Sequence, residues 1–205
     1  MSVQLWAKTK VLILNDMDGT VISMFREKGC NTSFIGVGTL VHDSFLEKFD
    51  LMVFCGGTDI SPNIYSDSRD FRTDTSDSIR DSFEIDMVQR AIRLGLGIIG
   101  ICRGAQLISC HLGGSLVQHD KTGKHLSSHD LILEDSTLLE NVSASHHQIM
   151  LPPKCMDVIG YFESDCEVAV HKDYGALCYQ PHPEWEDSGS VNREVFFDLV
   201  LEYCI

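Results

Sequence analysis

The stretch from Gly97 to Ile108 constrains the fold more than any other part of this 205-residue chain. Its first half is a short apolar run typical of a buried strand, and its second half begins an apolar-periodic helix. Between them lies Gly100-Ile101-Cys102-Arg103-Gly104, a Gly-x-Cys-x-Gly pattern that indicates a nucleophile elbow with cysteine at its tip. Glycines relieve the crowding of such a turn, and the helix N-terminus favours a thiolate. A buried structural cysteine is the alternative interpretation of this pattern taken alone.

The composition is that of an ordinary globular protein, because 43% of the residues are hydrophobic and 22% are charged. A chain of this length can bury a full core, so we expect residues 1–205 to form a single domain. The formal net charge is −14, from 30 Asp+Glu against 16 Lys+Arg. A negative net charge of this size repels nucleic acids and anionic membranes, and we expect neither as a partner.

The eight cysteines are irregularly spaced and include no C-x-x-C pair. This pattern favours reduced, mostly structural cysteines over a disulfide framework. No apolar run approaches the ~20 residues of a membrane helix, and the N-terminus lacks the apolar core of a signal peptide. We therefore expect a cytoplasmic protein.

Short apolar runs of strand length recur along the chain, and amphipathic helical patterns separate or follow some of them. Residues 79–94 repeat apolar side chains at helical spacing, and residues 195–203 form a second such pattern at the C-terminus. The runs that predict strands cover residues 10–15, 50–55, 97–101, 131–134, 157–162, 167–171 and 176–180.

The last of these runs ends in Gln180-Pro181-His182-Pro183-Glu184. Residues two apart in extended backbone face the same side, so the imidazole of His182 and the carboxylate of Glu184 can touch. An H-x-E pair alone is more typical of a surface ion pair. Together with Cys102, however, it supplies a nucleophile, a base and a group that orients the base. Each of the three follows a predicted strand, where parallel α/β sheets place active sites.

The segment Asp16-Met17-Asp18-Gly19-Thr20 follows the first predicted strand. It resembles the first motif of haloacid dehalogenase-type phosphatases, in which Asp16 would be the nucleophile and Asp18 the acid. Those enzymes also need a downstream acidic pair that holds magnesium, and no convincing pair follows a strand here. A polar turn is therefore the favoured interpretation.

His119, His125 and His129 lie close together in a segment rich in Lys, Gly and Ser. Their spacing fits no standard zinc template, and no cysteine lies nearby to complete one. We therefore expect loop histidines and no metal site. In Ser145-His146-His147-Gln148, adjacent histidines point to opposite faces of an extended chain, so at most one serves any one site.

Taken together, the elbow at Cys102 and the segment from Gln180 to Glu184 resemble the class I glutamine amidotransferase family. In detail they are similar to its gamma-glutamyl hydrolase branch, which includes gamma-glutamyl-GABA hydrolases. The resemblance implies an α/β fold of the flavodoxin-like type, with a mostly parallel central sheet flanked by helices. Four further pieces match that branch in order: Gly56-Gly57-Thr58-Asp59-Ile60-Ser61-Pro62 with Tyr65, Arg80-Asp81 with Glu84, Leu112-Gly113-Gly114-Ser115-Leu116, and Ser145 to Gln148.

The resemblance also implies a role for each candidate residue, and it implies neither cofactor nor metal. The segment from Asp16 to Thr20 matches no motif of the family, so its role and the substrate contacts from that end stay open. The implied roles are Cys102 as nucleophile, His182 as base, Glu184 as the group orienting it, the backbone N–H groups of Gly57 and Arg103 as oxyanion hole, Gln106 as a contact to the glutamyl portion, and Ser145 and His146 as further substrate-binding residues.

The implied reaction is hydrolysis of a gamma-glutamyl amide through a gamma-glutamyl thioester, which releases glutamate and an amine. The alternative is a glutaminase subunit that passes ammonia from glutamine to a separate synthase partner. Arg103 directly after the nucleophile is typical of the hydrolase branch and favours the first. A non-catalytic relative is a further alternative, which the intact set of three residues disfavours.

The segment from Asp67 to Asp86 is acidic and follows the predicted oxyanion loop. We expect it to border the side of the site that receives the leaving group. Its carboxylates would then favour a charged amine over ammonia. The residues expected to act in this way are Asp70, Asp74, Asp77, Asp81 and Glu84.

Overall fold

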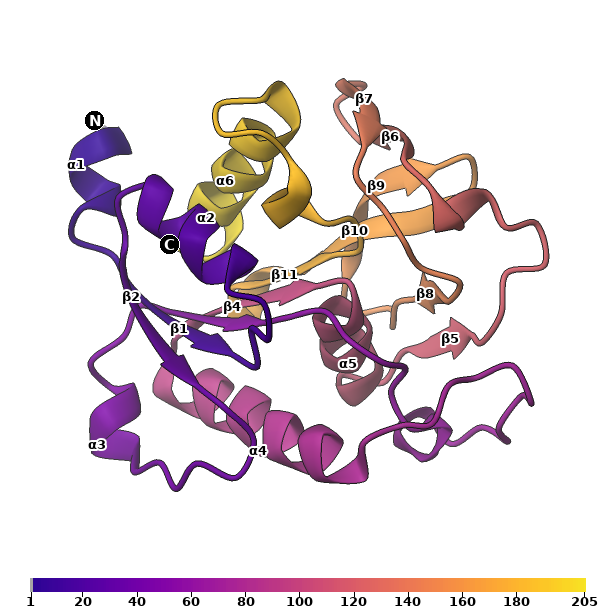
Figure 1. The fold of residues 1–205 in the computed structure, drawn as a ribbon, viewed down its shortest axis with the longest axis horizontal. Helices are drawn as coiled ribbons and strands as arrows, with labels where there is room; N and C mark the ends of the chain where they lie inside the picture. Colours follow the sequence, from indigo (N-terminus) through magenta and orange to yellow (C-terminus); the bar gives the residue numbers. More distant parts are fainter. Residues whose placement is uncertain (1) are drawn as a thin grey trace.

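The structure, a computed structural model, describes residues 2–205. Its eleven strands belong to one sheet, and helices pack on both faces of it (Figure 1). The strand order is β2-β1-β3-β4-β11-β10-β9-β6-β7, with β5 and β8 off this path. Within residues 2–205 no helix has the length and apolar character needed to cross a membrane.

Five neighbouring strands, from the β2 edge of the sheet to β11, are parallel, which confirms the predicted α/β fold. The inner ones are buried along almost their whole length because helices cover both faces, which explains their continuous apolar sequences. In spatial order these strands are β2 (Asn31–Ile35), β1 (Lys10–Leu14), β3 (Leu51–Phe54), β4 (Gly97–Ile101) and β11 (Ala176–Tyr179).

Antiparallel strands extend the sheet beyond β11, and they come from the chain between α5 and β11. This antiparallel extension lies at the opposite end of the sheet from β2 (Figure 1). Its strands are β5 (Ser115–Val117), β6 (His129–Leu133), β7 (Leu138–Val142), β8 (Ile149–Leu151), β9 (Asp157–Phe162) and β10 (Asp165–His171).

The helices divide between the two faces of the sheet. On one face lie α2 (Thr20–Glu27) and α6 (Val191–Tyr203); on the other lie α4 (Ser78–Leu94) and α5 (Arg103–His111), as Figure 1 shows. Successive residues of β1 alternate between the two cores, because strand side chains point to opposite faces. The remaining elements are α1 (Ser2–Trp6), α3 (Asp43–Leu46), and the short 3₁₀ helices η1 (Pro62–Tyr65), η2 (Lys124–Leu126), η3 (Lys172–Tyr174) and η4 (Pro183–Trp185).

The strands and helices predicted from apolar runs are present, with most ends shifted by a residue or two; the C-terminal helix begins four residues earlier than predicted, at Val191. The apolar-run analysis missed β2, whose sequence Asn31-Thr32-Ser33-Phe34-Ile35 is largely polar. It lies at the edge of the sheet and is half exposed, so no apolar run marks it. It also missed α2 and the strands β5, β7 and β8, which are short or exposed on one side.

Two glycines allow α5 to pack directly on the parallel strands. A Cβ on Gly104 would collide with the carbonyl oxygen of Phe54 in β3. A Cβ on Gly100 would lie 2.5 Å from the backbone nitrogen of Ala105, one turn into α5. The glycines on either side of Cys102 therefore determine how closely the helix approaches the carboxyl ends of β3 and β4.

We expect the substitution Gly104→Ala to destabilise the fold by about 1–3 kcal/mol, the usual cost of overpacking a core. Urea denaturation followed by circular dichroism measures this. Gly36→Ala is the matched control, because a Cβ there would come no closer than 4.0 Å to its neighbours. Equal midpoints for the two variants would contradict the close packing of α5.

Candidate active site

Cys102 lies at the junction of β4 and α5 with φ 50° and ψ −107°. A positive φ costs energy in a residue with a side chain, and such strain is concentrated at functional sites. The Cys102 N–H donates to the carbonyl oxygen of Tyr179 in β11 at 2.9 Å, which fixes the turn to the sheet. Arg103 is the first residue of α5, so its N–H has no acceptor within the helix.

His182 and Glu184 follow β11, the strand beside β4. His182 Nδ1 lies 2.6 Å from Glu184 Oε1, and the His182 ring stacks on Trp185 with centroids 3.7 Å apart. A Cβ built on Gly56 would contact both the His182 ring and the Cys102 Cβ, so the imidazole lies against the cysteine. The structure therefore brings together the three side chains that the sequence pattern selected.

The imidazole of His182 carries a proton at neutral pH in this environment. Burial by itself lowers the pKa of His182, but interactions with Cys102 and Glu184 outweigh it and raise the pKa to about 10. An imidazolium between a sulfur and a carboxylate can hold negative charge on the sulfur. It can also give its proton to a group that departs from an adduct at Cys102.

The loop after β3 brings Gly56 and Gly57 next to the cysteine. Gly57 has a φ of 151°, and a Cβ there would collide with the guanidinium of Arg80. That guanidinium donates to the carbonyl oxygens of Cys55 at 3.0 Å and Gly56 at 2.8 Å. Arg80 thus holds the carbonyl groups of this loop. Gly57 of the loop, the expected oxyanion donor, lines the same cavity as Cys102.

Arg80 belongs to a buried network of two arginines and two carboxylates. Arg80 Nε donates to Glu84 at 2.9 Å, and the Arg103 guanidinium pairs with Glu84 and, at 2.5 Å, with Asp81. Asn15 at the end of β1 donates to Glu84 at 2.6 Å. The network joins the ends of β1 and β3 to α4 and α5, and its formal charges cancel.

Two cavities meet at the candidate site. One, of about 140 Å³, is lined by Cys102 and Gln106; the other, of about 230 Å³, is lined by His182 and Glu184. Gly57 lines both. Cys102 lines the smaller cavity and His182 the larger one, and the two cavities share Gly57.

The other expected substrate-binding residues line the smaller cavity. Ser145 and His146 lie on its wall together with Gln106, whose amide contacts Gln180 at 3.3 Å. Asp59, Asp74 and His147 also line this cavity, and the sequence analysis had not selected them. His147 Nε2 lies 3.1 Å from a carboxylate oxygen of Asp59. His146 and His147 both line this cavity, so the expectation that at most one of them serves one site is wrong.

The expectation that His125 and His129 are loop histidines is wrong. His125 lies on η2 and His129 begins β6, and both are buried together with His146 and Glu167. Spacing along the chain could not reveal this cluster, because the antiparallel extension brings in Glu167 from a distant strand. His119 is the exception among the three and lies 3.2 Å from His147, ring nitrogen to ring nitrogen.

The expectation that five carboxylates of the segment from Asp67 to Asp86 border the leaving-group side is wrong for most of them. Asp74 lines a cavity of the site. Asp81 and Glu84 are buried against Arg103, Asp70 pairs with Arg72 at 2.7 Å, and Asp77 caps the N-terminus of α4. Arg72 and Arg80 within the segment, and Arg103 outside it, thus pair with three of the five carboxylates.

The segment from Asp16 to Thr20 reaches the larger cavity and also begins α2. Asp16 accepts from the Ile22 N–H at 2.7 Å, and Asp18 accepts from the Thr20 N–H at 3.0 Å. These bonds are typical of a polar turn that leads into a helix. The segment is thus a turn, as favoured from sequence, whose acidic side chains lie at the candidate site.

A sequence profile of the Peptidase C26 family matches residues 36–170. The chain is similar to the glutamine amidotransferase-like protein YvdE of Lactococcus lactis, at 29% identity over 165 residues and 70% of each chain. It is also similar to protein NtpR of Enterococcus hirae, at 26% identity over 78% of this chain and 77% of NtpR.

Among solved structures, PurLQS from Thermotoga maritima resembles this chain with a TM-score of 0.71. The match covers 96% of this chain and 99% of that one at 16% identity. At this identity the likeness concerns the fold, and it agrees with the sheet and helices described above.

The imidazolium of His182 should make Cys102 the most reactive thiol toward iodoacetamide at neutral pH. We expect His182→Asn to slow labelling of Cys102 by at least about tenfold, because the sulfur loses its positive neighbour. The advantage should narrow above about pH 8.5, where ordinary thiols ionise, and the contribution of His182 should be lost above about pH 10, where the imidazole loses its proton. Mass spectrometry of labelled peptides measures the rates, and the exposed Cys155 is an internal control whose rate should not change.

Proposed function

The chain belongs to the Peptidase C26 family, and on that premise we propose that it hydrolyses a gamma-glutamyl amide through a thioester on Cys102. The observation that supports this most directly is that Cys102 and His182 line two cavities that share Gly57. A scissile amide that passes Gly57 would have its acyl part in one cavity and its amine in the other. This is the arrangement that a hydrolase of substituted amides requires.

In this proposal the Cys102 sulfur attacks the amide carbon, and the carbonyl oxygen acquires negative charge. The backbone N–H groups of Gly57 and Arg103 would stabilise that charge; loss of one such donor typically costs ~10²–10³ in turnover. His182 then gives its proton to the departing amine and later takes one from the water that cleaves the thioester. Glu184, 2.6 Å from His182 Nδ1, holds the ring in position.

The smaller cavity suits the glutamyl portion. Its wall carries the carboxylates of Asp59 and Asp74, which can pair with the α-ammonium group of glutamate. Gln106 and Ser145 offer polar contacts on the same wall. Its volume of about 140 Å³ leaves little room for more than one amino-acid side chain.

The larger cavity suits the amine. Its wall carries Asp16 and Asp18 beside His182, so a cationic group would be attracted there. Hydrogen bonds from Thr20 hold the pKa of Asp18 below its usual value, which keeps this carboxylate ionised. Trp185, half exposed and stacked on His182, adds an apolar surface for a carbon chain.

Cys102→Ala should abolish glutamate release and formation of a covalent acyl-enzyme, because it removes the sulfur that forms the thioester. The measurement is release of glutamate from gamma-glutamyl amides, together with intact-protein mass spectrometry. Cys110→Ala is the control, since that cysteine is buried in α5 away from both cavities. Residual turnover by Cys102→Ala would contradict the proposed mechanism.

The isolated protein should hydrolyse a gamma-glutamyl amide of a cationic amine at least about tenfold more efficiently than glutamine, a difference of ~1.4 kcal/mol in barrier. Asp18→Asn should erode that preference while leaving glutamine turnover nearly unchanged, because ammonia does not reach Asp18. Asp173→Asn, an exposed aspartate on η3, is the matched control. Steady-state kcat/KM values on both substrates decide the question.

The alternative is a glutaminase subunit that feeds ammonia to a synthase, and the glutamine amidotransferase-like name of YvdE keeps it open. Such a subunit would show equally low rates on glutamine and on every gamma-glutamyl amine when it is alone. A partner protein would then be needed for turnover. That pattern would replace the hydrolase proposal and leave the role of Cys102 intact.

A further inference from the structure

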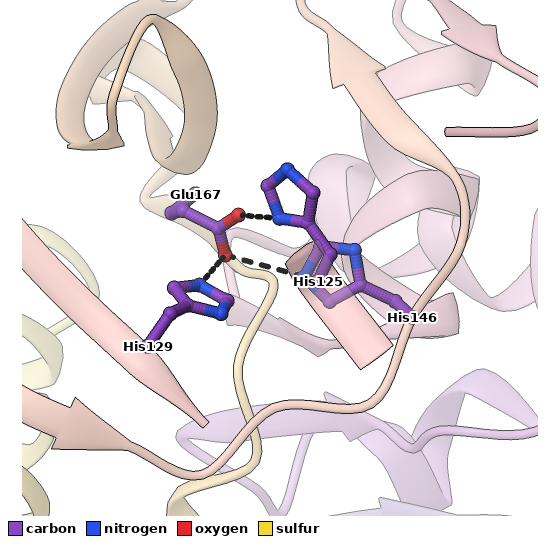
Figure 2. Close-up of side chains that lie close together, drawn as sticks. All are labelled: His125, His129, His146 and Glu167. Carbon is purple, nitrogen blue, oxygen red and sulfur yellow. Dashed lines mark ion pairs between the residues drawn. The ribbon is translucent and has the colours of Figure 1, made fainter. Parts of the chain in front are cut away.

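A second cluster of buried ionisable side chains lies within the antiparallel extension. His125, His129, His146 and Glu167 come from four separate segments, and their side chains are 0–4% exposed. One nitrogen or oxygen atom of each lies within 4.8 Å of those of the other three. Figure 2 shows the three imidazole rings around the Glu167 carboxylate.

Each of the three rings has an inner nitrogen that faces Glu167 and an outer nitrogen that faces away from it. The contact of the outer nitrogen fixes the tautomer of the ring. In each case its neighbour is a carbonyl or carboxylate oxygen that can only accept, so the outer nitrogen carries the hydrogen. The inner nitrogens of neutral rings therefore present lone pairs toward Glu167. The outer contacts are His125 Nε2 to Asp165 Oδ2 at 3.1 Å, His129 Nδ1 to Ser127 O at 3.1 Å, and His146 Nδ1 to Gln148 O at 2.9 Å.

The inner atoms are close together but poorly aligned for hydrogen bonds. His125 Nδ1 lies 3.0 Å from Glu167 Oε1, while His129 Nε2 and His146 Nε2 lie 3.6 and 3.5 Å from Oε2. Among the described residues none of these five atoms has a hydrogen-bond partner that meets the angular requirements. Lone pairs that face one another in a buried space repel unless a cation lies between them.

Formal charge is compatible with a divalent ion. One divalent metal ion with three neutral imidazoles balances the two negative charges of the buried Glu167 and the partly exposed Asp165. Such an ion would also take up the lone pairs that face one another.

We propose that His125, His129, His146 and Glu167 bind one zinc ion. Zinc prefers four nitrogen, sulfur or carboxylate ligands in a tetrahedron, with bonds of about 2.0–2.1 Å that place ligand atoms roughly 3.3 Å apart. The inner atoms are already spaced at 3.0–3.6 Å around Glu167. Magnesium and calcium prefer oxygen ligands and fit this set poorly.

The outer contacts support the same conclusion. Histidines that bind a metal characteristically donate their other ring N–H to a carboxylate or a backbone carbonyl, as all three do here. Four ligands from the protein leave no open coordination position, so the site is structural. It would join η2, β6, the segment before β8 and β10, and its existence does not depend on the proposed hydrolase activity.

The experiment uses the full chain with Cys102→Ala, so that the reactive thiol cannot bind metal. The protein is stripped with a chelator, exposed to zinc and dialysed, and its zinc content is measured by atomic emission. A titration against a chromophoric chelator gives the affinity, and cobalt substitution reports tetrahedral geometry through its visible spectrum. We expect one zinc per chain, a tetrahedral cobalt spectrum and a higher melting temperature with zinc.

Variants locate the bound ion. Glu167→Gln and His129→Gln should lose it, while the exposed matched controls Glu140→Gln and His42→Gln should keep it. Asp165→Asn should keep the stoichiometry but weaken affinity by about 10–100-fold, because it only orients His125. This variant decides the question if Glu167→Gln fails to fold, as judged by circular dichroism.

Three results would overturn the proposal. The first is that the Cys102→Ala protein, with its histidine cluster unaltered, retains no zinc and shows no shift in melting temperature when zinc is added. The second is an affinity that Asp165→Asn leaves unchanged. The third is loss of zinc in Asp74→Asn, which would place the ion instead at the partly buried group of Asp59, Asp74 and His147.

Discussion

The buried pairing of Arg103 with Asp81 and Glu84 is the interaction on which the candidate site depends. Arg103 begins the helix after Cys102, and its two partners lie on α4. Arg80 uses the same Glu84 and holds the carbonyl groups of the loop that contains Gly57. Removal of one member would leave an uncompensated buried charge, which typically costs about 3–5 kcal/mol.

This pairing explains why polar residues occupy a position that would otherwise be core. The carboxyl ends of β1, β3 and β4 meet the N-terminus of α5 here, and hydrophobic side chains could not hold the carbonyl groups of the glycine loop. Asn15 closes the network from β1 by donating to Glu84. The network therefore fixes the position of Gly57 relative to Cys102, which any oxyanion contact would require.

The antiparallel extension supplies one wall of the candidate site. It places Glu167 beside β11, where the Gln180 N–H donates to the Glu167 carbonyl oxygen at 2.8 Å. His146, which lines the cavity next to Cys102, points its Nε2 into the histidine cluster. One wall of the candidate site is thus built on buried polar contacts between elements that lie far apart in the sequence. How rigid that wall is depends on whether each of these buried polar groups has a partner.

The sequence by itself determined four of the five parallel strands (β1, β3, β4 and β11) and the position of Cys102. Buried strands and a glycine-flanked turn leave local signals in composition and spacing. It also selected His182 and Glu184, since residues two apart in extended chain share a side. It could not place the carboxylates between Asp67 and Asp86, because folding brings Arg103 of another helix against Asp81 and Glu84. Nor could it place His125, His129 and Glu167 together, because their contacts arise from antiparallel pairing between β6, β9 and β10. The local sequence pattern indicates which residues are buried, whereas only the tertiary structure decides which buried polar groups contact one another.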